Sequence, residues 1–297
     1  MENSISIKYT DSYKEVKALQ PFAIRSLLRN MALSGLSLKN GIAGIEKYLL
    51  KPRVQFLYIH HIFKDELQNF ENLLSTLSKH HTFLSYSDAV NKILTGTVDK
   101  PYISISSDDG FKSNLLAMEA LRKYNASACF FINPGLIGET DFSVIKKHCK
   151  EKLNFPPVEF LSWKDVETLQ NAGHEIGSHT MNHIDIAKST HTEIDEDMRQ
   201  TFEILKIKCG GVAHFAFPYG RFFNFNEIGR KAVFDAGFTS CATAERGCHI
   251  KQDTVLLPEK FCIRRDHVVL DWNMNHILYF IANNSKKANV STNLFPY

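Results

Sequence analysis

The chain has 297 residues, of which 44% are hydrophobic and 23% charged, and its formal net charge is +3. These values are ordinary for a globular protein, and the length can bury a large core. No cluster of Lys and Arg forms a phosphate-binding stripe, so we expect no nucleic-acid partner. No apolar run approaches the ~20 residues that cross a bilayer, so we expect no transmembrane segment.

Cysteine usage indicates a reducing compartment. The six cysteines are widely spaced and none forms a Cys-x-x-Cys pair, so we expect free structural thiols. The first residues lack the basic and apolar regions of a signal peptide, and we therefore expect a cytoplasmic protein. The cysteines are Cys129, Cys149, Cys209, Cys241, Cys248 and Cys262.

In chain order, the first segment carries no chemical motif. Scattered apolar positions predict an N-terminal helical extension over residues 1–50, packed on the rest of the chain. Contact of this extension with a membrane surface stays open. Residues 139–157 are expected to form an inserted loop. The polar residues 283–297 are expected to form a frayed C-terminal tail.

Between residues 51 and 282, short apolar runs alternate with helical patterns. Strands are expected at 54–59, 102–106, 128–132, 174–177, 214–217 and 238–242. Helices are expected at 67–80, 114–124, 162–172, 192–207 and 227–236. This alternation predicts a parallel α/β sheet, open or closed into a barrel. The length fits two domains of typical size or one barrel, so the number of domains stays open.

Polar residues follow several of the predicted strands. His60, Asp108–Asp109, His179 and Tyr219 each come just after a strand. In open parallel sheets and in barrels, functional residues lie past the carboxyl ends of the strands. We therefore expect these side chains to share one site.

Two neighbouring carboxylates, Asp108 and Asp109, precede Gly110. One carboxylate can bind a cation while the other stays free as a base, and the glycine permits the tight turn that directs both into one cavity. Taken alone, the segment also fits a solvated turn.

His179 and His183 are separated by four positions. This spacing places both imidazoles on one helical face, or on one turn of a loop, where they can share a metal. Two histidines with one carboxylate leave coordination positions open for water and substrate. Taken alone, the pair also fits two surface histidines.

The combined order of these segments resembles the polysaccharide deacetylase (NodB-homology) family, carbohydrate esterase family four. Ser-Asp-Asp-Gly-Phe is followed by the strand Cys-Phe-Phe-Ile and then by Gly-His-Glu-Ile-Gly-Ser-His-Thr-x-x-His. The resemblance covers roughly residues 54–270. It implies a single catalytic domain with a distorted (β/α) barrel of about seven strands. It also implies a divalent metal, and removal of acetyl groups from N-acetylated or, less often, O-acetylated sugars.

The resemblance also implies residue roles. Asp109, His179 and His183 would be the metal ligands, and Asp108 the general base. Phe-Ala-Phe-Pro-Tyr-Gly, which ends at Gly220, resembles the family's third motif. The backbone N–H of Tyr219 would then help to hold the oxyanion.

The third motif lacks the arginine that usually orients the base. The motifs of this chain resemble most those of the poly-N-acetylglucosamine deacetylase branch. In that branch an arginine later in the chain orients the base. Arg265 is the preferred candidate here and Arg264 the alternative.

The general acid is open between early and late histidines. His60 in Leu-Tyr-Ile-His-His matches that branch best, and His61 is the alternative. His267 and His276 are the late candidates. An imidazole with a pKa near neutrality suits proton donation to the leaving amine.

The sequence thus predicts a metal-dependent deacetylase of an N-acetylated sugar, either a polysaccharide or its lipid- or nucleotide-linked precursor. Two alternatives remain: a non-catalytic carbohydrate-binding relative, and a hydrolase of the same fold acting on a non-sugar amide. Zinc is the expected metal, with cobalt, nickel and iron compatible with the same ligands. The oligomeric state is not predicted.

Overall fold

The computed structural model describes residues 8–19, 33–36, 44–252, 257–289 and 293–297. Within these residues, no helix is both long and apolar enough to cross a membrane. The N-terminal extension includes the described helices α1 (Tyr13–Leu19) and α3 (Glu46–Leu49), and most of the remaining extension lies outside the described residues.

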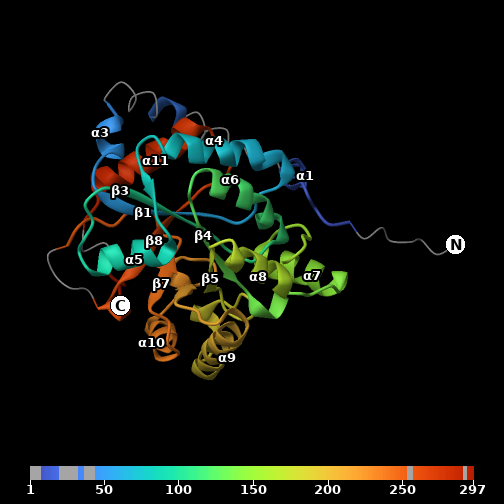
Figure 1. Cartoon of the computed structure of the whole chain (residues 1–297). Coiled ribbons are helices and arrows are strands. Elements are labelled where there is room, and N and C mark those ends of the chain that lie inside the picture. The colour runs from blue at the N-terminus through green and yellow to red at the C-terminus, as the bar shows by residue number, and fades with distance from the viewer. Residues whose placement is uncertain (1–7, 20–32, 37–43, 253–256, 290–292) are drawn as a thin grey trace.

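Seven parallel strands form a closed barrel (Figure 1). The ring closes because β1 pairs with both β8 and β3, and the order around it is β1-β8-β7-β6-β5-β4-β3. The short strand β2 (Thr82–Phe83) pairs with β3 outside the ring. The barrel strands are β1 (Arg53–Ile59), β3 (Pro101–Ser107), β4 (Ala128–Ile132), β5 (Glu175–Ser178), β6 (His214–Ala216), β7 (Ser240–Thr243) and β8 (Cys262–His267). The closed alternative of the sequence prediction, an α/β barrel of about seven strands, is confirmed.

Helices surround the barrel because its strands are buried on both faces and must be covered. Every residue of β1 and of β4 is buried. In Figure 1, α4 and α11 cover one side of the barrel, and α9 and α10 the opposite side. The covering helices are α4 (Leu67–Leu77), α5 (Tyr86–Leu94), α6 (Met118–Lys123), α8 (Trp163–Asn171), α9 (His191–Cys209), α10 (Glu227–Asp235) and α11 (Met274–Lys287).

Helix starts follow ordinary capping chemistry. Ser162 begins α8 by accepting a hydrogen bond from the backbone N–H of Asp165, whose carboxylate accepts from Ser162 in return. Such a capping box satisfies donors that the first helical turn leaves free. The predicted helix at 114–124 begins instead as a 3₁₀ helix, Lys112–Ala117, which continues into α6.

Residues 139–157 are not a loop. They contain α7 (Phe142–His148), which continues as a π-helix (Cys149–Leu153). Ile145 and Cys149 are buried in an apolar cluster with Phe111, and this packing stabilises a helix whose exposed positions are polar. Tertiary packing thus outweighs a composition that is typical of loops.

The expected C-terminal tail is ordered where it is described. Helix α11 extends to Lys287, so the predicted boundary at residue 283 falls inside it. Leu294 pairs with Phe261 in an antiparallel bridge, and the buried Phe295 lies 5.9 Å from Phe225 between ring centroids. The prediction of a frayed tail is therefore wrong for these residues.

Gly177 on β5 allows the barrel interior to pack closely. A Cβ atom at this position would lie 2.4 Å from Phe131 Cδ1 and 3.2 Å from Cys129 Sγ. We expect Gly177→Ala to lower the free energy of unfolding by about 1–3 kcal/mol through overpacking. Urea unfolding measures the loss, and Gly177→Ala with Phe131→Leu should recover part of it. An unchanged unfolding midpoint in the single variant would contradict this packing argument.

Candidate active site

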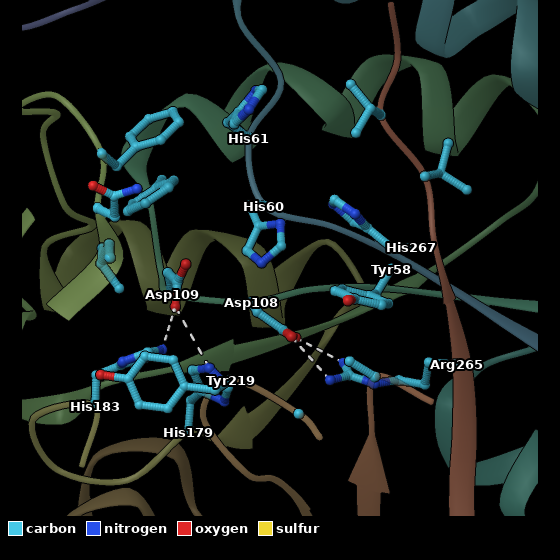
Figure 2. A pocket seen from close by; sticks show the side chains of 18 of the residues that line it. Tyr58, His60, His61, Asp108, Asp109, His179, His183, Tyr219, Arg265 and His267 are labelled. Carbon is cyan, nitrogen blue, oxygen red and sulfur yellow. Dashed lines mark hydrogen bonds and ion pairs between the residues drawn. The ribbon is translucent and has the colours of Figure 1, made fainter. Parts of the chain in front are cut away.

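The carboxyl ends of the strands meet around one pocket of about 390 Å³. Asp108 and Asp109 follow β3, His179 follows β5, and Tyr219 follows β6. In Figure 2, Asp109 faces His179 and His183, the Asp108 carboxylate faces Arg265, and His60 lies above the two carboxylates. The expected convergence of residues that lie far apart in the sequence is therefore present.

Asp108 forms a two-pronged ion pair with Arg265. Arg265 Nη1 donates to Asp108 Oδ1 at 2.7 Å, and Nη2 donates to Oδ2 at 2.9 Å. Burial is the largest single effect and raises the pKa of Asp108, but the charge and hydrogen bonds of Arg265, together with the charges of His179 and His60, outweigh it, so the pKa lies below its usual value. Asp108 is therefore ionised near neutral pH and can accept a proton.

Arg265 is held inside the barrel by other strands. Its Nη1 also donates to Ser106 Oγ at 3.2 Å, and its Nε donates to the Thr243 carbonyl at 3.3 Å. Its guanidinium lies 4.6 Å from the ring centroid of Tyr58 and 5.0 Å from that of Phe131. These contacts fix the plane of the guanidinium and thereby the orientation of the Asp108 carboxylate.

The neighbouring Arg264 has different partners. Its Nη1 donates to the Arg246 carbonyl at 3.3 Å, and its guanidinium lies 5.3 Å from the Phe222 ring centroid. Arg265, and not Arg264, is therefore the candidate arginine that donates hydrogen bonds to Asp108.

Asp109, His179 and His183 form a compact cluster. One ligand atom of each lies within 4.8 Å of the others, and each histidine Nε2 is 3.5 Å from Asp109 Oδ1. His179 and His183 lie in the turn that follows β5, so the loop form of the His-x-x-x-His expectation applies rather than the helical one.

The donor set of this cluster fits a divalent metal. Asp109 Oδ1 is buried and has no hydrogen-bond partner within the described part of the chain. His179 Nδ1 donates to the Ala216 carbonyl at 2.7 Å, which leaves the Nε2 lone pair directed to the cluster. Burial and then the Asp108 charge raise the pKa of Asp109 well above its usual value, and a bound cation would offset both effects.

Backbone conformation directs these side chains. Asp109, Thr180, His183 and Tyr219 all have positive φ, of 73°, 65°, 55° and 62°. This left-handed region is costly for residues with a Cβ atom, and such residues cluster at functional sites. Gly220 follows Tyr219 with φ of 65°, where an added Cβ would lie 2.3 Å from the Ala244 Cβ.

The histidine pair after β1 separates into two environments. His60 lies at the pocket, with its ring centroid 5.5 Å from that of Tyr58 and 4.9 Å from that of His267. Burial lowers the pKa of His60 to about 4, although the Asp108 charge opposes the shift. The pKa of His60 therefore lies below the near-neutral range that suits proton donation.

His61 turns toward the rim of the pocket. Its Nδ1 is 2.8 Å from the buried Glu66 carboxylate, and its ring stacks on Phe63. Of the late histidines, His267 lies beside His60 and its ring stacks on Tyr58 at 4.9 Å. His276 lies on α11, within 3.1 Å of Ser34 Oγ, and does not line the pocket.

Sequence reasoning missed residues that support the site from a distance. Both carboxylate oxygens of Asp197 on α9 accept from the Met181 N–H, at 3.0 and 3.1 Å, and thereby fix the turn that carries His183. His148 on α7 lies 6.5 Å from His183 between ring centroids. Asp197 lies on a long amphipathic helix, and His148 lies in the stretch that was expected to be a loop. Neither residue has a motif that marks it.

Asp197 makes stability depend on pH. Burial raises its pKa from an ordinary 3.8 to about 6, although hydrogen bonds from Met181 and Thr201 oppose the shift. Because the folded pKa is raised, this contribution to stability is full below about pH 4 and is lost as pH rises through 6. In Asp197→Asn, stability relative to the unaltered chain should therefore rise by up to about 3 kcal/mol between pH 4 and 7.

Urea unfolding of both proteins at a series of pH values, with chelator present throughout, measures this difference. The other titrating groups are common to both proteins and cancel. A stability difference that does not change with pH would contradict the assigned burial of the Asp197 carboxylate.

The fold and the pocket together define an α/β barrel with a candidate metal centre at the carboxyl ends of its strands. The sequence profile of polysaccharide deacetylase matches residues 95–241. No curated protein matches the chain significantly. On the profile match and the motifs described above, residues 95–241 belong to a domain of the polysaccharide deacetylase family, carbohydrate esterase family four.

Several solved structures share the fold at low sequence identity. The Streptococcus pyogenes deacetylase PplD, in complex with acetate, is 16% identical with a TM-score of 0.60, over 78% of this chain and 99% of that one. IcaB from Ammonifex degensii is 16% identical with a TM-score of 0.60, over 80% and 98% of the two chains. The polysaccharide deacetylase BC0361 from Bacillus cereus is 18% identical with a TM-score of 0.60, over 78% and 69%.

Proposed function

We propose that this protein is a metal-dependent hydrolase that removes the acetyl group from an N-acetylated sugar. The family supports carbohydrate deacetylation. The observation that carries the proposal is the pairing of two distinct carboxylates in one pocket. Asp108 is ionised against Arg265, while Asp109 lies with two histidines in a cluster that fits a cation.

Each residue of the pocket then has a separate task. A divalent ion held by Asp109, His179 and His183 would supply Lewis acidity toward the amide carbonyl. Asp108 takes a proton from the attacking water as the new carbon–oxygen bond forms. Arg265 keeps Asp108 ionised and correctly oriented. The Tyr219 backbone N–H donates to the developing oxyanion.

His60 is the proposed proton donor to the sugar nitrogen as the carbon–nitrogen bond breaks. With a pKa of about 4, His60 is neutral near pH 7, so it must first take up a proton, and the proton that Asp108 removes from the attacking water balances this step. Asp108 is the negative charge that favours this protonation. The pocket also has His267 beside His60, and transfer between the two rings is the alternative route.

Finer points are part of the proposal. Zinc is the proposed metal, because two histidines and a carboxylate suit it. Assignment to the poly-N-acetylglucosamine branch is supported by an arginine from β8 in place of one in the third motif. A cytoplasmic location is supported by the six free cysteines, which suit a reducing compartment. Membrane contact by the N-terminal extension stays a prediction.

Acetate release tests the proposed function. The metal-free protein is reconstituted with one equivalent of Zn²⁺, Co²⁺, Ni²⁺ or Fe²⁺ and incubated with N-acetylated and O-acetylated oligosaccharides. Release of acetate that requires metal is the expected result. Metal binding without acetate release would favour a carbohydrate-binding relative, and release only from non-sugar amides would favour the other alternative hydrolase.

A further inference from the structure

A short N-terminal segment crosses one side of the barrel mouth. Residues 8–19, here called the strap, include α1. Near the start of the strap, the Thr10 N–H donates to the Pro157 carbonyl at 2.8 Å, and the Tyr9 ring lies 5.3 Å from that of Phe142. Pro157 and Phe142 both belong to the connection after β4, so this part of the strap is fastened to that connection.

Two further anchors fasten the strap to other loops. Asp65, after β1, accepts from Ser12 Oγ and from the backbone N–H groups of Tyr13 and Lys14, at 3.0–3.2 Å. Lys17 Nζ lies 2.9 Å from Asp271 Oδ2, after β8. In the barrel, β4, β3, β1 and β8 are consecutive. The strap therefore spans the rim above one continuous half of the barrel.

The inner side of the strap forms part of the pocket wall. Val16 is only 1% exposed and lines the pocket together with Tyr13. The Tyr13 ring stacks on His61, which stacks in turn on Phe155, with both centroid distances 5.4 Å. Residues 152–155 and 268–270 continue the same wall. On this side the pocket is bounded by packed side chains.

The remaining half of the rim, above β5, β6 and β7, carries exposed aromatic rings. Tyr219 is 42% exposed and lines the pocket, and Phe223, four residues later, is 78% exposed. Exposed aromatic side chains offer flat apolar faces beside a polar site, which is a common composition of ligand-binding surfaces.

We propose that the strap closes one end of the substrate site, so that the sugar deacetylated here is the terminal unit of a saccharide. The proposal rests on the proposed function and specifies its substrate. An internal unit needs space for the chain on both sides, but the strap closes one side. The cavity of about 390 Å³ also lies near the lower end of the ~300–1,000 Å³ range of ligand pockets. The rest of the saccharide would leave over Tyr219 and Phe223.

Mapping the product tests this proposal. The metal-reconstituted protein is incubated with β-1,4- and β-1,6-linked penta-N-acetylglucosamine carrying an ¹⁸O label at the reducing end. Tandem mass spectrometry then identifies which unit has lost its acetyl group. We expect one terminal unit to be deacetylated about tenfold or more faster than any internal unit, because the strap sterically excludes a saccharide that continues on that side.

Two strap variants and a control test whether the strap causes the preference for a terminal unit. Asp65→Ala removes three hydrogen bonds to the strap, and Lys17→Ala removes its ion pair to Asp271. Both should shift deacetylation toward internal units. Glu71→Ala removes a comparable surface acid, paired with Lys123 on the outside of the barrel, and should leave the product map unchanged.

The outcomes separate the inference from the proposed function. Equal loss of acetyl from internal and terminal units in the unaltered protein would overturn the inference alone. A terminal preference that both strap variants retain would show that the strap does not cause it, which also overturns the inference. No acetate from any acetylated sugar would refute the proposed function and the inference with it.

Discussion

Asp108→Asn should lower acetate release by about 10²–10⁴-fold, the contribution typical of a positioned general base. Asparagine has nearly the same shape and can still accept a hydrogen bond from Arg265, but it cannot take a proton from water. The candidate metal cluster of Asp109, His179 and His183 is not altered. We therefore expect the variant to bind metal with unchanged stoichiometry, as measured by isothermal titration.

Asp235→Asn is the matched control, because Asp235 is an exposed acid on α10 that pairs with Lys231. It should have unaltered turnover. If Asp108→Asn retained the turnover of the control, Asp108 would not be the base. If it lost metal instead, Asp108 would be part of the metal site.

Replacing Arg265 should have the largest effect on stability. Arg265→Met leaves the Asp108 carboxylate buried without its partner, which typically costs about 3–5 kcal/mol. Burial would then raise the pKa of Asp108, so the acid limb of the pH–rate profile of any remaining activity should shift to higher pH. Chemical unfolding and a pH–rate profile measure the two effects. Arg265→Lys keeps the charge without the two-pronged geometry. Its stability and activity should therefore lie between those of the unaltered protein and those of Arg265→Met.

Arg264→Met is the matched control, since it alters the neighbouring arginine without touching Asp108. The double variant Arg265→Met with Asp108→Asn should recover part of the lost stability, because it removes both charges of a buried pair. Equal stability of the Arg265→Met and Arg264→Met proteins would contradict the buried ion pair described here.

The elements that sequence patterns predicted well are those with uniform burial. β4 is apolar at nearly every position and matches its predicted bounds, 128–132. The helix at 162–172 has a capping serine and a terminating Gly173 with φ of 85°. In these elements, local chemistry and tertiary packing favour the same structure.

The strand that carries Arg265 could not be predicted from its pattern. β8 reads Cys-Ile-Arg-Arg-Asp-His, and a run with three charged residues does not look like a buried strand. Arg265 and Asp266 are nevertheless buried, because Asp108 pairs with the first while Gln55, Arg246 and Asn284 bind the second. The partners come from distant parts of the chain, so no local pattern encodes the burial.

The candidate site was predictable to the extent that its residues lie in motifs. Asp108, Asp109, His179 and His183 lie in two compact segments, and the structure brings both segments into one pocket. The sequence preferred Arg265 over Arg264, and the strand register supports that preference, since adjacent residues of a strand point to opposite sides. Choosing between His60 and His61 required the Glu66 carboxylate that binds His61.

The central claim is that a metal held by Asp109, His179 and His183 acts in removing acetyl groups from a sugar. The most direct measurement is acetate release from an N-acetylated oligosaccharide during titration of the metal-free protein with Zn²⁺. We predict that acetate release increases until one equivalent of metal has been added and stops when a chelator is added. We also predict that Asp109→Ala releases no acetate. Acetate release that is unaffected by chelation or by Asp109→Ala would contradict the claim.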